Sequence, residues 1–100
     1  MRMVAFVADL MDRSRLAGAT ASVEFAADAD AAAGAEVVVV DLARFAELVT
    51  AIRSGAPTAR IVAYGPHVDT ALLQRARVDG ADVVMPRSQF FRDPAAATGP

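Results

Sequence analysis

Four consecutive valines, at residues 37–40, impose the strongest constraint on how this 100-residue chain can fold. β-Branched side chains favour an extended backbone, and an uninterrupted apolar run needs apolar cover on both faces. Such runs are typical of central strands in parallel sheets, because a strand with one wet face alternates apolar and polar residues. The sequence therefore predicts a buried central strand over residues 36–41, ending at Asp41.

Four further segments have the length and composition of strands in the same sheet. They span residues 3–8, 22–25, 60–64 and 82–85. Helical patterns lie between them, over residues 11–17, 26–35, 45–52 and 69–79, with glycines near the predicted helix ends. Regular alternation of strands and helices with short connections predicts an α/β fold whose right-handed crossovers place helices on both faces. We therefore expect a flavodoxin-like, doubly wound sheet of five parallel strands in the order 2-1-3-4-5.

The size of the chain allows one domain, which we place at residues 1–92. The last helix is expected to be reduced, and residues 93–100, rich in Ala, Gly and Pro, are expected to form a disordered tail. Incomplete cover by that helix would expose apolar surface near the fifth strand. We accordingly predict a homodimer or an obligate partner. The contributing side chains would be Val83, Met85, Phe90 and Phe91.

Composition argues against several classes of protein. The net charge is only −2 and the basic residues are scattered, which disfavours nucleic-acid binding. No apolar run approaches the roughly 20 residues of a membrane span, and Asp9 and Asp12 interrupt the early apolar stretch, so a cytoplasmic protein is expected. There is no cysteine, one histidine and no phosphate-binding glycine loop, so we expect no enzyme and no nucleotide cofactor.

Candidate functional residues follow from the fold, because open parallel sheets bind ligands at the carboxyl ends of their strands. Asp9 follows the first strand with Asp12 beside it one helical turn later, Asp41 follows the third strand, Gly65 the fourth and Arg87 the fifth. Two carboxylates in one crevice supply part of the oxygen ligands that a divalent cation needs. Arg87 would pair with Asp41 or with a phosphoryl group.

Together these motifs resemble the response-regulator receiver domain. The likeness covers about residues 1–91 and rests on the strand that ends at Asp41, on residues 76–82 and on the basic residue after the fifth strand. It implies that Asp41 is the phospho-acceptor, that Asp9 helps to bind magnesium and that Arg87 stands where a lysine is usual. It also implies a kinase or an effector as the protein partner.

The sequence departs from the receiver pattern at several positions. Asp9 has no adjacent acid, since the next one is Asp12, and Gly65 lies where a hydroxyl side chain is usual. These departures predict a degenerate or pseudo-receiver that binds magnesium weakly or not at all, with Asp9 and Asp41 as its only ligands.

Each candidate residue also has a purely structural interpretation. Asp41 suits the N-cap of the following helix, Asp9 or Asp12 suits the cap of the first helix, and Arg87 suits an ion pair with Asp41. Two functions therefore remain open. The first is a stand-alone signalling module of the phosphorelay type that acts through protein contacts, with an accessible Asp41 as acceptor. The alternative is a non-catalytic scaffold or oligomerisation protein that keeps the fold without phosphotransfer.

Overall fold

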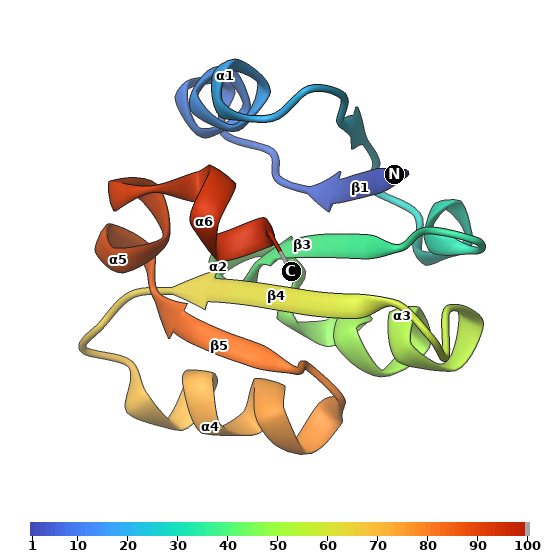
Figure 1. The fold of residues 1–100 in the computed structure, drawn as a ribbon. Coiled ribbons are helices and arrows are strands. Elements are labelled where there is room, and N and C mark those ends of the chain that lie inside the picture. The colour runs from blue at the N-terminus through green and yellow to red at the C-terminus, as the bar shows by residue number, and fades with distance from the viewer. Residues whose placement is uncertain (100) are drawn as a thin grey trace.

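The computed structural model describes residues 1–99 and shows a five-stranded parallel sheet (Figure 1). Its strand order is β2-β1-β3-β4-β5, which confirms the predicted topology. The strands are β1 (Met3–Phe6), β2 (Glu24–Phe25), β3 (Val37–Asp41), β4 (Arg60–Gly65) and β5 (Val83–Pro86). Every paired strand is parallel to its neighbour, so the carboxyl ends of all five meet at one edge.

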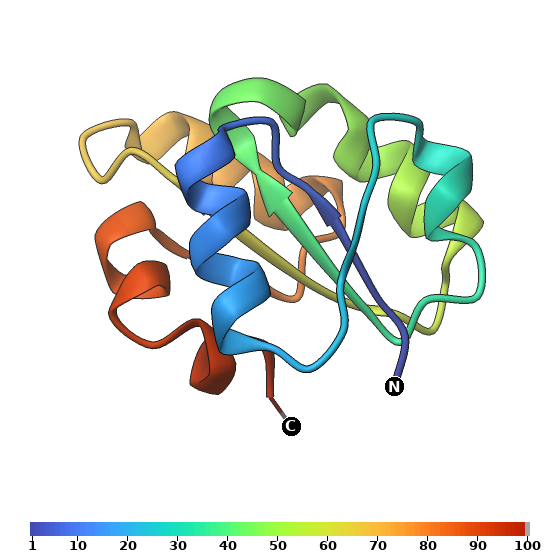
Figure 2. The same cartoon turned by 90° about the horizontal axis from the view of Figure 1, so that it is seen from above.

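Helices cover both faces of the sheet, as Figure 2 shows from above. One face carries α1 (Leu10–Ala19), α5 (Arg87–Arg92) and α6 (Pro94–Thr98). The opposite face carries η1 (Ala29–Ala32), α2 (Leu42–Phe45), η2 (Ala46–Leu48), α3 (Val49–Gly55) and α4 (Thr70–Asp79). Within residues 1–99 none of these helices has the length and apolar character needed to cross a membrane.

The valine strand β3 divides the interior into two apolar clusters, one on each face. Val38 and Val40 belong to the cluster under α2, α3 and α4, whereas Val37 and Val39 belong to the cluster under α1 and α5. All five residues of β3 are buried. Successive side chains of a strand point to opposite faces, so the unbroken valine run supplies both clusters at once.

Three predicted helices differ in detail from the structure. The one expected over residues 26–35 is reduced to the four-residue 3-10 helix η1. The first helix continues through Gly18 to Ala19, because no left-handed residue is needed there and Thr20 ends it by binding the carbonyl of Leu16 through both its amide and its hydroxyl. The helix predicted at residues 45–52 begins earlier, at Leu42, and is broken into α2, η2 and α3.

The tail is ordered, contrary to expectation, as far as the structure describes it. Asp93 caps α6 by accepting a hydrogen bond from the amide of Ala96, and Thr98 is buried. Arg60, at the start of β4, donates to the carbonyl oxygens of Ala97 and Gly99. A local pattern of small residues carries no sign of such a long-range anchor, and Pro100 lies outside the described residues.

Phe90 was wrongly assigned to an exposed interface. Its side chain is fully buried, and its ring stacks on that of Tyr64 with centroids 4.7 Å apart. Val83, Met85 and Phe91 are partly buried against the same cluster. The short helix α5 therefore covers this face from within, because it turns Phe90 inward. Val83, Met85 and Phe91 remain as candidate interface residues, and the homodimer stays a prediction.

Replacing Phe90 by alanine should lower the free energy of unfolding by about 3–5 kcal/mol, because a fully buried aromatic ring leaves a cavity. Val78→Ala is the matched control, since Val78 is 78% exposed on α4 and should change stability by less than about 0.5 kcal/mol. Urea unfolding followed by circular dichroism measures both. Equal stability of the two variants would show that Phe90 faces solvent after all.

Candidate functional site

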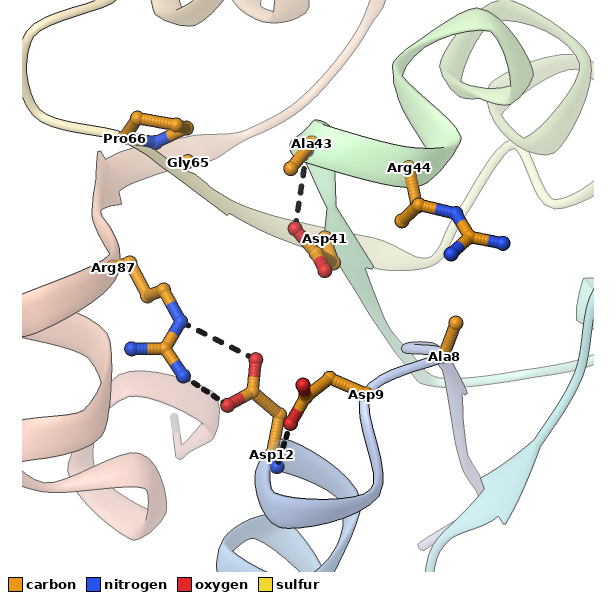
Figure 3. Close-up of a pocket in the computed structure, with 9 residues that line it drawn as sticks. All are labelled: Ala8, Asp9, Asp12, Asp41, Ala43, Arg44, Gly65, Pro66 and Arg87. Carbon is orange, nitrogen blue, oxygen red and sulfur yellow. Dashed lines mark hydrogen bonds and ion pairs between the residues drawn. The ribbon is translucent and has the colours of Figure 1, made fainter.

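A crevice of about 470 Å³ opens at the carboxyl ends of the strands (Figure 3). It is lined by Ala8, Asp9, Asp12, Asp41, Ala43, Arg44, Gly65, Pro66 and Arg87. The structure thus brings together all five residues that the sequence placed at this edge. The parallel topology explains this, because each of them follows or ends a strand whose last residue points toward the same edge.

Asp12 and Arg87 form the central ion pair of the crevice. Asp12 is only 2% exposed, and Arg87 donates to both of its carboxylate oxygens, from Nη2 to Oδ1 and from Nε to Oδ2 at 3.3 Å. The hydroxyl of Tyr64 also donates to Oδ2, at 3.2 Å. This corrects the expected pair between Arg87 and Asp41. The first turn of α1 carries Asp12 toward the end of β5, where it meets Arg87 before Asp41 does.

Aromatic rings hold this pair in position. The guanidinium of Arg87 lies 5.1 Å from the centre of the Phe91 ring, and that ring packs edge-on against Tyr64. The hydrogen bond to Asp12 raises the pKa of Arg87, and burial, followed by the negative charges of Asp41 and Asp12, raises the pKa of Tyr64. Arg87 therefore stays a cation and Tyr64 a neutral donor throughout the physiological range of pH.

Asp41 ends β3 and is 7% exposed, so it is less accessible than expected. Its Oδ1 caps α2 by accepting a hydrogen bond from the amide of Ala43 at 3.1 Å. Burial raises the pKa of Asp41 against the opposing effect of the Ala43 bond; the charges of Asp12 and Asp9 raise it further, and that of Arg87 lowers it. The carboxylate form of Asp41 is thus incompletely compensated by its surroundings.

Asp9 and Gly65 shape the two sides of the crevice. Asp9 is the N-cap of α1, since its Oδ1 accepts a hydrogen bond from the amide of Asp12 at 2.9 Å. A Cβ atom on Gly65 would lie 3.2 Å from Leu73 and 3.4 Å from Leu42, so this position admits a side chain only if those leucines shift. The capping roles suggested by the sequence for Asp9 and Asp41 are both present.

These residues do not fit the divalent-cation site that a receiver fold implies. Among residues 1–99 no three Asp, Glu, His or Cys side chains lie together in a way that would hold a metal ion. Both oxygens of Asp12 accept hydrogen bonds from Arg87, and one oxygen of Asp9 caps α1. One oxygen on each of Asp9 and Asp41 stays free, which is fewer protein ligands than a built divalent-cation site supplies.

Tyr64 was not predicted to be a site residue. Its ring is buried among apolar side chains, and only its hydroxyl reaches Asp12. One signal was available: Tyr64 is the only tyrosine of the chain and stands at the carboxyl end of a predicted strand, where a buried hydroxyl needs a polar partner. Asp12 was named as a neighbour of the crevice, but its partner followed only from the fold.

Comparison with known proteins gives similarity in structure only. No family model matches the sequence, and no curated protein matches it. A response regulator protein from Burkholderia pseudomallei, solved with a phosphorylated aspartic acid, a calcium ion and citrate, has a TM-score of 0.76 and 20% identity. That match covers 98% of this chain and 65% of the other, so the chain spans less than two thirds of that protein.

Two further solved structures are similar over nearly their whole length. The CheY-like protein TadZ from Pseudomonas aeruginosa has a TM-score of 0.72 and 22% identity, covering 88% of this chain and 87% of that one. The pilus assembly protein CpaE from Caulobacter crescentus has a TM-score of 0.64 and 18% identity, covering 95% and 97%. The chain therefore has the CheY-like receiver fold that the resemblance implied.

Removing the cation of the central pair should destabilise the protein. Arg87→Met leaves the carboxylate of Asp12 buried with only the Tyr64 hydroxyl, and we expect a loss of about 2 kcal/mol at pH 7. Arg92→Met, at an exposed position of the same helix, should cost less than about 0.5 kcal/mol. Adding Asp12→Asn to Arg87→Met should recover part of the loss in urea unfolding. An unchanged free energy of unfolding in Arg87→Met would mean that the ion pair contributes nothing to stability.

Removing the charge of Asp41 should have the opposite effect and make the folded protein more stable. Because the pKa of Asp41 is raised in the folded protein, the stability it contributes is complete at low pH and is lost as the pH rises through the folded pKa. Asp41→Asn keeps a good helix cap and removes the charge, so it should be more stable than the original protein at pH 7. The difference should shrink toward pH 4.

Thermal unfolding at pH 4 and pH 7 measures this difference. Asp69→Asn is the matched control, because Asp69 caps α4 from an exposed position. If Asp41→Asn were less stable than the original protein at pH 7, the pKa of Asp41 would not be raised in the folded protein.

Proposed function

We propose that this protein is a receiver-like signalling module that acts through protein–protein contacts and does not use phosphoryl transfer. The observation that supports this most strongly is the ion pair of Asp12 with Arg87. It engages both oxygens of Asp12, the other buried acid of the crevice.

The guanidinium of Arg87 is a permanent part of the protein, whereas a metal ion can bind and leave. Phosphoryl transfer depends on metal ions or guanidinium groups that neutralise the charge developing on the transferred group. Here both Nε and Nη2 of Arg87 already donate to Asp12, so the charge of Arg87 is largely used inside the protein. Of the oxygens of Asp9 and Asp41, one on each side chain is engaged as a helix cap. The crevice is therefore better suited to one constant state than to a metal-dependent switch.

The names of similar structures point in the same direction. TadZ is described as CheY-like, and CpaE as a pilus assembly protein. Proteins similar in fold thus include one described as a pilus assembly protein, and we propose a role in protein–protein contacts for this chain. The resemblance to receiver domains continues to suggest a kinase or an effector as the partner.

The second candidate function is a phosphorylated receiver with Asp41 as acceptor. It is favoured by the position of Asp41, at the end of β3 and in the wall of the crevice. It is also favoured by the Burkholderia response regulator, whose structure holds a phosphorylated aspartic acid and a calcium ion. In this candidate Asp9 and Asp41 would have to bind magnesium with few protein ligands.

Treatment with acetyl phosphate and magnesium separates the two functions. We expect no acid-stable, base-labile adduct by intact-protein mass spectrometry, and no stoichiometric heat on titration with magnesium. The variant Asp41→Ala controls for labelling elsewhere on the chain. A stoichiometric, magnesium-dependent adduct that disappears in Asp41→Ala would overturn the proposed function and establish the second candidate.

A further inference from the structure

Exposed apolar side chains lie next to crevice residues on the first turn of α1 and on the loop after β4. Leu10 and Met11, which follow the crevice residue Asp9, are 77% and 68% exposed, and Val68, two residues after Pro66, is 77% exposed. Single exposed apolar residues are ordinary on protein surfaces. These three, however, are among only five large apolar side chains that are strongly exposed within residues 1–99, and they belong to the segments that border one acidic hollow.

Inside the crevice, Asp41 has an oxygen without a protein partner. Asp41 as a whole residue is 7% exposed, and its Oδ1 accepts a hydrogen bond from the amide of Ala43. Its Oδ2 accepts no hydrogen bond from residues 1–99 and points toward the space that Asp9, Asp12 and Arg87 border (Figure 3). A carboxylate held in this way is a ready acceptor for a donor that enters from outside.

The charges of the crevice favour a cation as that donor. Three aspartates and two arginines line it, and Arg87 is paired with Asp12. The remaining groups are Asp9, Asp41 and Arg44, with an excess of one negative charge. Arg44 is exposed, and its guanidinium lies away from Asp41 in Figure 3. Burial is the largest cause that raises the pKa of Asp41, and the charge of Arg87 opposes this only in part.

The walls leave room for a long side chain, because Ala8, Ala43 and Gly65 present little or no side chain to the hollow. An anion would fit less well. It would approach the unpaired carboxylate oxygens of Asp9 and Asp41, while Arg87 already uses two of its nitrogens on Asp12.

We propose that this crevice is the docking site for a partner protein that inserts one arginine or lysine side chain beside Asp41 and packs flanking apolar residues on Leu10, Met11 and Val68. This inference rests on the proposed function, in which the module acts by contact, and it specifies the chemistry of the partner. The buried cationic anchor gives specificity, and the apolar rim excludes water from it.

The test uses the full chain labelled with ¹⁵N and the probe peptide acetyl-Leu-Leu-Arg-Leu-amide. We expect saturable shifts of the amide signals of Asp9, Asp41 and Gly65 in two-dimensional NMR spectra. The peptide with citrulline in place of arginine has nearly the same shape and no charge, and it should bind about tenfold more weakly. Equal binding of the two peptides, or shifts confined to another face, would overturn the proposal.

Variants sharpen the test. Asp41→Asn, which keeps the helix cap, should weaken binding of the arginine peptide about tenfold. Arg44→Ala should strengthen it, because a repelling charge is removed, whereas it would weaken binding at an anion site. Leu10→Ser should weaken both peptides, and Val78→Ser, on the exposed surface of α4, should change neither. Weaker binding by Arg44→Ala, or unchanged binding by Asp41→Asn, would contradict a cation site.

The result is independent of the phosphorylation experiment. Labelling of Asp41 by acetyl phosphate together with arginine-specific peptide binding would overturn only the proposed function. Absence of labelling together with equal binding of both peptides would overturn only the docking site.

Discussion

The ion pair between Asp12 and Arg87 is the interaction on which the rest of the site depends. It joins residues 75 positions apart and ties the first turn of α1 to the beginning of α5 across the end of the sheet. Tyr64 contributes a hydroxyl to it from β4, and Phe91 contributes a ring beneath the guanidinium. Since a buried carboxylate is costly without a partner, the position of Arg87 is strongly determined.

Because Arg87 pairs with Asp12, the three acids of the crevice have different roles. Asp12 is neutralised internally, Asp9 serves mainly as the cap of α1, and Asp41 is left with one engaged and one free oxygen. Burial and the neighbouring negative charges make Asp41 a source of instability in its charged form. Residues that lower stability and face a crevice are typical of functional sites. A cation supplied by a partner would compensate Asp41 without any change in the pair beside it.

The position of the site was predictable because it follows from local patterns combined with one topological rule. Asp9, Asp41, Gly65 and Arg87 each adjoin the end of a recognisable strand, and parallel strands bring such ends together. The choice of partners was not predictable. The sequence allowed Arg87 to pair with either Asp41 or Asp12. The direction in which α1 leaves β1 places Asp12 beside Arg87, and this determines the partner. The same limit applied to Phe90, whose inward orientation depends on the angle at which α5 packs on Tyr64.

By itself the sequence determined the parallel sheet, its strand order and the edge at which polar groups collect. Four valines in succession need cover on both faces, and Asp and Gly residues end the elements on either side, so these features are encoded within a few residues of one another. Only the tertiary structure decided that Arg87 binds Asp12, that Arg60 orders the last helix and that Phe90 lies in the core. Each of these contacts joins segments far apart in the chain. Their energies depend on burial and relative orientation, which no local pattern records.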